Sequence, residues 1–205
     1  MSRVPFRRRD VIRTLWMSGA AAAARPAWSD ALSALAHEHA RQPAPPPAAD
    51  WTPSVLDAHQ NETVIALTEA IIPETDTPGA RAALVNRFVD QVLAEADSRE
   101  RDEFLRGLKG LDERCRERAG APFASCTAAQ QTAALADISA EGPGSPADRD
   151  RAEFFQAVKA MTIAGYYSSE IGLRQELGDD GTLAFAEFPG CEHPEHGAPP
   201  KKPTT

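Results

Sequence analysis

Several features that mark cofactor enzymes are missing from this 205-residue chain. It has no Gly-x-Gly-x-x-Gly, no P-loop and no Cys-x-x-Cys-His motif, so the sequence predicts no dinucleotide, nucleoside-phosphate or haem site of its own. Acidic residues outnumber basic ones, and the net charge of −8 argues against a nucleic-acid partner. No run of about 18 or more apolar residues occurs, which excludes an ordinary membrane-spanning helix.

The remaining composition is that of a globular protein. Hydrophobic residues make up 42% of the chain and charged residues 25%, and the length fits one domain with appendages. Aromatic residues are few, at 6%, and the 17 prolines gather mainly in linkers and near the C-terminus. We therefore expect one globular body between less regular ends.

The N-terminus has the pattern of an export signal. Arg8 and Arg9 precede a mildly apolar stretch and a run of alanines that ends at Ala24, which is the order of regions in a secretory signal. Paired arginines at this place are typical of the twin-arginine route. We expect residues 1–36 to be a twin-arginine signal, with cleavage near 24 or 36, and the mature protein to be periplasmic. A soluble basic arm is the alternative.

Residues 37–50 are rich in proline and lack an apolar period, which predicts an extended linker. His37 and His39 lie at its start and could contact a metal, but two histidines on a flexible arm are a weak metal signal.

Apolar residues at helical spacing predict an all-α domain over residues 51–177, an irregular bundle of about five helices. We expect helices over residues 52–72, 80–96 and about 99–120, a fourth after a capping box of Thr127 and Gln130, and a last long helix from about residue 154. The mixed-charge faces of the third helix, which include Asp112, are expected to be solvated, and His59 to lie at the edge of a face.

A tight corner separates the first two expected helices. Its members combine two prolines, one glycine and short oxygen-bearing side chains: Pro73, Glu74, Thr75, Asp76, Thr77, Pro78 and Gly79. The first proline ends the preceding helix, and the glycine lets the backbone pass closely. The two threonines and the aspartate can accept free amides of the next helix. A calcium site is the weaker alternative, because two carboxylates fall short of about six to eight oxygen ligands.

This corner resembles the signature of the gluconate 2-dehydrogenase subunit 3 family. A second segment, Gly165-Tyr166-Tyr167-Ser168-Ser169-Glu170-Ile171-Gly172, is similar to another stretch of that family, and the likeness spans about residues 52–191. The resemblance implies a small, exported, non-catalytic helical subunit without a cofactor of its own. It also implies a large flavin-dependent partner of the glucose–methanol–choline type that holds FAD, and with it the twin-arginine translocase and a cytochrome c subunit as further partners. Membrane association would come through this complex.

The two motifs supply the expected partner interface, whose members are Pro73, Thr75, Asp76, Thr77, Pro78, Gly165, Tyr166, Tyr167, Ser169 and Glu170. Tyrosine is common at binding hot spots and in buried anchors, so core packing is the alternative for the tyrosines. A rival hypothesis is an independent enzyme that uses Glu170 as a base with Tyr166 or Tyr167.

Three cysteines in an exported chain leave one without an intramolecular partner. Cys115 and Cys126 could pair, or Cys115 could be buried as a small hydrophobe. Cys191 lies in a Pro-Gly-rich tail, residues 178–205, of the kind that the resemblance includes, and is the candidate for an intersubunit disulfide. The competing hypothesis is a stand-alone binding or metal protein with ligands Cys191, His193 and His196.

Overall fold

The computed structural model describes residues 28–41, 51–139 and 146–181, and these residues fold into an all-α bundle, as the sequence predicts. The helices are α2 (Trp28–Arg41), α3 (Ala58–Ile71), α4 (Val85–Glu95), α5 (Ser98–Ala119), α6 (Ala128–Ser139) and α7 (Pro146–Tyr167), with a short 3₁₀ turn η2 (Phe123–Ser125) and a π-helical turn η3 (Ile171–Glu176). Within these ranges no helix is both long and apolar enough to cross a membrane.

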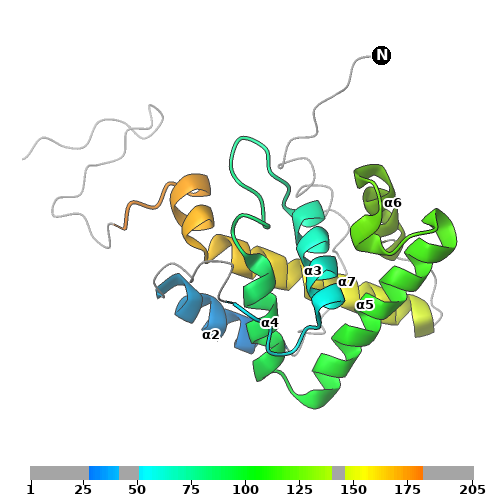
Figure 1. The fold of residues 1–205 in the computed structure, drawn as a ribbon. Helices are drawn as coiled ribbons and strands as arrows, with labels where there is room; N and C mark the ends of the chain where they lie inside the picture. The colour runs from blue at the N-terminus through cyan, green and yellow to red at the C-terminus, as the bar shows by residue number, and fades with distance from the viewer. Residues whose placement is uncertain (1–27, 42–50, 140–145, 182–205) are drawn as a thin grey trace, which may run out of the picture.

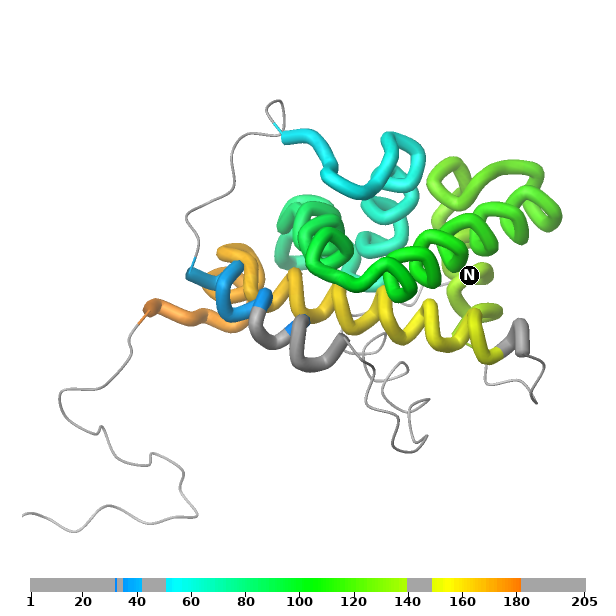
Figure 2. The backbone as a smooth tube through the Cα atoms, turned by 90° about the horizontal axis from the view of Figure 1, so that it is seen from below, coloured from blue at the N-terminus to red at the C-terminus, as the bar shows by residue number. Residues whose placement is uncertain are grey.

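Helix α7 is the axis of the bundle. It contacts α2, α3, α4, α5 and α6 (Figure 1), and Figure 2 shows it running the length of the domain with α5 alongside. Phe154 of α7 lies edge-on to Phe104 of α5 with ring centroids 5.5 Å apart. A Cβ atom at Gly107 would come within 2.2 Å of the Phe154 ring, so this glycine allows the two long helices to approach closely.

Helix α3 begins later than residue 52, where the sequence predicted its start. Asp57 is its N-cap and forms a capping box with Gln60. The amides of residues 54–56, which we call the leading segment, bind the carboxylate of Asp90 instead of entering a helix. A side chain distant in sequence thus competes successfully for these amides, and the helix starts only after them.

Helix α4 also begins later than expected, at Val85 in place of residue 80. Leu84 precedes it with φ of 55°, the left-handed region that leucine seldom occupies. The left-handed conformation of Leu84 changes the direction of the backbone between the corner and the start of α4. The expected stop of α5 is confirmed, because Gly120 caps it with φ of 76°. The Thr127–Gln130 capping box is present before α6.

Helix α2 covers residues that the sequence assigned to a signal and a linker. Residues 37–41 are helical, so the prediction of an extended linker is wrong for them. Leu32 is buried and belongs to the core, and α2 contacts both α4 and α7. The apolar period was missed because the alanines and histidines of this stretch give only a weak stripe.

Candidate functional site

The predicted corner, residues 73–79, is a closed loop that one carboxylate holds. Glu69 in the last turn of α3 accepts hydrogen bonds from the amide of Glu74 at 2.9 Å and from the amide of Arg81 at 2.8 Å. The amide of Ala80 donates to the carbonyl of Ile72 at 2.9 Å, which closes the loop at its base. In Figure 1 the corner rises between α3 and α4.

Glu69 was missed by the sequence reasoning, although a signal existed. A carboxylate in the last turn of a helix faces the negative end of the helix dipole, so it needs a compensating partner. Here the partners are the two backbone amides of the corner. The expectation that the threonines and aspartate of the corner cap the next helix is wrong, because α4 begins only at Val85 and the amide of Arg81 binds Glu69.

Space explains the glycine of the corner. A Cβ atom at Gly79 would lie 2.5 Å from the Glu69 carboxylate and 2.6 Å from the amide nitrogen of Glu74. Any side chain at this position would therefore displace the carboxylate that organises the loop, and the predicted close passage of the backbone is confirmed.

The two motifs that lie far apart in the sequence meet in the fold. Tyr166 is fully buried at the end of α7, and its hydroxyl donates to the carbonyl of Pro78 at 2.9 Å. A Cβ atom at Gly165 would lie 2.8 Å from the ring of Phe88, so the helix packs directly on α4 at this point. Tyr167 lies edge-on to Tyr166 with ring centroids 5.2 Å apart.

The end of α7 is shaped by Ser169. Its hydroxyl donates to the carbonyl of Tyr166 at 2.6 Å and accepts from the amide of Gly172 at 3.0 Å. A Cβ atom at Gly172 would come within 2.0 Å of the Tyr166 carbonyl oxygen, so glycine is required where α7 gives way to η3. The hydroxyl of Thr77 in the corner contacts the carboxylate of Glu176 in η3.

Burial divides the ten predicted interface residues into three groups. Gly165, Tyr166 and Ser169 are buried, so they support the surface from inside. Four are half-buried: Pro73, Thr77, Pro78 and Tyr167. Thr75, Asp76 and Glu170 are exposed. Thr75 and Asp76 follow the exposed Glu74, and Thr77 contacts the partly exposed Glu176; we call residues 74–77 with Glu176 the corner surface. A partner could touch the exposed side chains of this surface directly.

The arrangement gives no support to the hypothesis of an independent enzyme. Glu170 is exposed and pairs with Arg174, 3.6 Å from nitrogen to oxygen. The Tyr166 hydroxyl is directed to the corner carbonyl of Pro78 instead. The carboxylate of Glu170 and the hydroxyl of Tyr166 are thus engaged with different partners.

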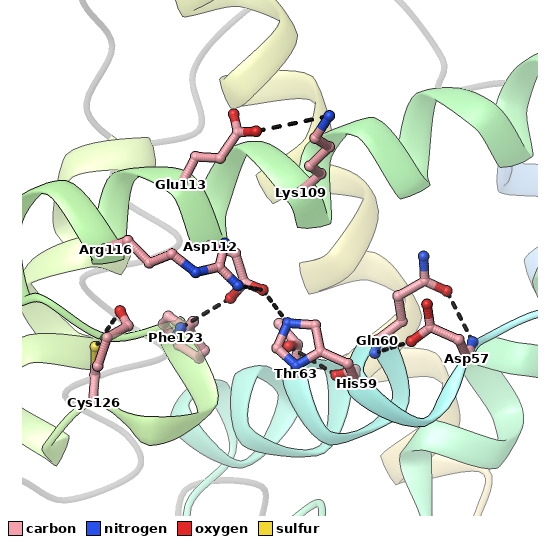
Figure 3. Close-up of polar contacts among 11 residues, drawn as sticks. Asp57, His59, Gln60, Thr63, Lys109, Asp112, Glu113, Arg116, Phe123 and Cys126 are labelled. Carbon is pink, nitrogen blue, oxygen red and sulfur yellow. Dashed lines mark hydrogen bonds and ion pairs between the residues drawn. The ribbon is translucent and has the colours of Figure 1, made fainter.

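A polar cluster that the sequence did not predict lies between α3 and α5, at the end of α3 opposite to the corner (Figure 3). Asp112 of α5 is buried, with 5% of its surface exposed, so its expected place on a solvated face is wrong. Its carboxylate contacts Nε2 of His59, accepts a hydrogen bond from the Phe123 amide at 2.9 Å, and lies 3.6 Å from Arg116. His59 is exposed beside it, at the edge of its face as predicted.

This cluster borders an open groove of about 440 Å³ that is also lined by Arg106 and Lys109. A histidine held by a buried carboxylate can serve as a general base. The one hydroxyl in the described lining belongs to Thr63, and it donates to the backbone carbonyl of His59 at 3.0 Å. Through its contacts with His59 and the Phe123 amide, Asp112 also joins α5 to α3 and η2.

The histidines of α2 are placed differently from each other. His37 is exposed. His39 is half-buried, with Nδ1 2.9 Å from the Ser168 hydroxyl and its ring centroid 5.3 Å from that of Phe88, and burial lowers its pKa below the usual 6.5. No group of three or more metal-ligating side chains is found in the described part of the chain.

Several predicted residues lie outside the described ranges and stay predictions. These are Arg8, Arg9, Cys191, His193 and His196.

The fold and the corner define a class: a small all-α protein whose two strongest motifs brace each other and frame an exposed loop. A family model described as gluconate 2-dehydrogenase subunit 3 matches residues 58–190, more than half of the chain, and the chain belongs to this family. The family name is that of a subunit of a dehydrogenase complex. No curated protein and no solved structure matches the chain.

Proposed function

We propose that this chain is the non-catalytic small subunit of a flavin-dependent dehydrogenase of the glucose–methanol–choline type. In this proposal a large partner holds FAD and oxidises a sugar, sugar acid or polyol, and the electrons pass to a cytochrome c subunit or a quinone. The small subunit stabilises the partner and performs no chemistry. The observation that carries the proposal is the family match over residues 58–190, which includes both motifs.

The corner surface is the proposed docking site. Its backbone is fixed by Glu69 and by the buried Tyr166 hydroxyl, so little conformational entropy remains to be lost on binding. The side chains that face outward at its tip are Glu74, Thr75 and Asp76. A rigid, acidic loop of this kind fits a basic recess on a partner.

Export is the second part of the proposal. Arg8 and Arg9 would direct the folded chain, with its partner bound, through the twin-arginine translocase into the periplasm. The packing of Leu32 in the core favours cleavage near residue 24, because cleavage near 36 would remove a buried part of α2. The mature chain would keep this helix.

Co-expression with a large flavin-dependent dehydrogenase of the glucose–methanol–choline type tests the proposal. We expect sugar or polyol oxidation by the co-purified complex and none by this chain alone. Arg8→Lys together with Arg9→Lys should leave the flavoprotein in the cytoplasm. Turnover by the isolated chain, or normal export of the flavoprotein without the paired arginines, would reject the proposal.

A charge-reversal pair tests the docking site. Glu74→Lys with Asp76→Lys should weaken co-purification at least about tenfold, since a like charge opposite a basic recess costs more than about 1.4 kcal/mol. Glu117→Lys, on an exposed position of α5, is the matched control and should leave the complex intact. Equal binding by both variants would place the interface elsewhere.

A further inference from the structure

Two cysteines from different elements face the same small cavity. Cys115 lies on α5 and is buried, whereas Cys126 follows η2 and is partly exposed. Both line a cavity of about 190 Å³ between α5 and α6. Cys126 is also close enough to Cys115 to help raise the pKa of the Cys115 thiol, so the two side chains are neighbours at this cavity.

The loop between the two cysteines is built to bring them together. Gly120 turns the chain back at the end of α5, and the Asp112 carboxylate fixes the returning segment by accepting from the amide of Phe123 at 2.9 Å. The Cys126 thiol donates weakly to the carbonyl of Ala121 at 3.6 Å. The backbone therefore holds both thiols at the same cavity before any bond joins them. A disulfide needs Cβ atoms about 4 Å apart, a spacing that two side chains on one small cavity can adopt.

We propose that Cys115 and Cys126 form an intramolecular disulfide in the mature protein, which leaves Cys191 as the one cysteine available to another chain. Two thiols lose two protons and two electrons as the S–S bond forms, and a disulfide oxidant, either a protein disulfide or glutathione disulfide, is reduced to two thiols. The inference rests on the proposed function for its oxidising compartment.

Exposure sets the order of the two exchange steps. Cys126 can reach the oxidant and forms the mixed disulfide first. Cys115 then attacks the Cys126 sulfur and releases the reduced oxidant. Burial and the neighbouring Cys126 raise the pKa of the Cys115 thiol to about 11, so its thiolate is scarce at neutral pH and this second step is the slow one.

The test uses the full chain with Cys191→Ser, purified reduced and then incubated with glutathione disulfide. Trypsin cuts after Arg116 and Arg118, so the two cysteines fall on separate peptides that only a disulfide keeps together. We expect the linked peptides, loss of both alkylation sites, and a melting temperature that reductant lowers by about 5–10 °C. The matched variant, Cys126→Ser with Cys191→Ser, should show none of these changes. Two alkylatable thiols in the folded Cys191→Ser chain would overturn the inference.

A second arm separates this inference from the proposed export. The same Cys191→Ser chain is recovered from cells and alkylated at once. A bond both in cells and in the redox buffer supports the inference and an oxidising location. A bond in the buffer alone supports the cysteine pairing and counts against export, whereas reduced thiols in both arms overturn the pairing whatever the location.

Discussion

Two irregular segments of this chain are held by carboxylates in the same way, but at different depths. Asp90 is buried and accepts from the amides of Ser54, Val55 and Leu56 at 2.7, 3.0 and 3.0 Å. Glu69 accepts from two amides of an exposed corner. The deep brace includes the buried amide of Leu56, which water reaches poorly, whereas the shallow brace fixes the shape of a loop that water could also solvate. The first contributes mainly to stability and the second mainly to surface geometry.

The largest expected effect is at the deep brace. Asp90→Ala leaves three backbone amides of the leading segment without their acceptor, and we expect a loss of about 3 kcal/mol in the free energy of unfolding. Urea denaturation measures it. Glu69→Ala should lose only about 1 kcal/mol, because water can replace the carboxylate at the corner. Equal losses would show that depth does not distinguish the two braces.

The packing beneath the corner gives the next effect. Gly165→Ala places a Cβ atom 2.8 Å from the Phe88 ring, and the overpacking should lower the free energy of unfolding by about 1–3 kcal/mol. Gly110→Ala is the control, because nothing lies within 4 Å of its added Cβ atom in the interior of α5. That substitution should stabilise the fold by about 0.5–1 kcal/mol. Thermal unfolding of both variants compares them, and a Gly165→Ala protein as stable as wild type would contradict the close helix contact.

The helices were predictable where local chemistry decides them. The apolar period and Gly120 give both the course and the end of α5, and Thr127 with Gln130 gives the start of α6. The starts of α3 and α4 were not predictable in this way. A carboxylate distant in sequence, Asp90, captures the amides before α3, and a leucine in the left-handed region sets the start of α4.

The candidate site, too, has features that the local sequence predicts and features that depend on distant contacts. Its two motifs were found by resemblance. The close approach of neighbouring chain segments at the glycines of these motifs could be expected, because glycine has no side chain. The pairing of Tyr166 with Pro78, 88 residues away, depends on how α7 packs across the bundle. Glu69 and Asp112 were missed because a charged residue on a helix is usually solvated, and only the tertiary fold shows which carboxylates turn inward.

A smaller change sharpens the role of the shallow brace. Glu69→Gln keeps the size of the side chain but presents an NH₂ group to one of the two amides, at Glu74 or Arg81. We expect a loss of less than about 1 kcal/mol in the free energy of unfolding. We also expect faster hydrogen exchange that is confined to the corner amides. Hydrogen-exchange mass spectrometry resolves this. Exchange that rises equally in the leading segment would contradict a local role.

The smallest expected effect concerns α2, which is held by packing and one imidazole instead of a carboxylate brace. Burial lowers the pKa of His39 below the 6.5 of an exposed histidine, so the unfolded chain binds a proton more readily than the folded one. The contribution of neutral His39 to the free energy of unfolding is therefore complete above about pH 6.5, and it is lost as the pH falls through the lowered pKa. Because His39 is only half-buried, the slope should be shallow.

The measurement is the urea midpoint between pH 7.5 and 5, for wild type, His39→Gln and the exposed control His37→Gln. We expect His39→Gln alone to flatten the decline, since glutamine keeps a polar contact to Ser168 without a charge that burial must penalise. Parallel curves for all three proteins would mean that α2 does not sense this protonation. In that case His39 would contribute nothing to the pH dependence, and the packing of Leu32 and its apolar neighbours would be the main contact of α2 with the bundle.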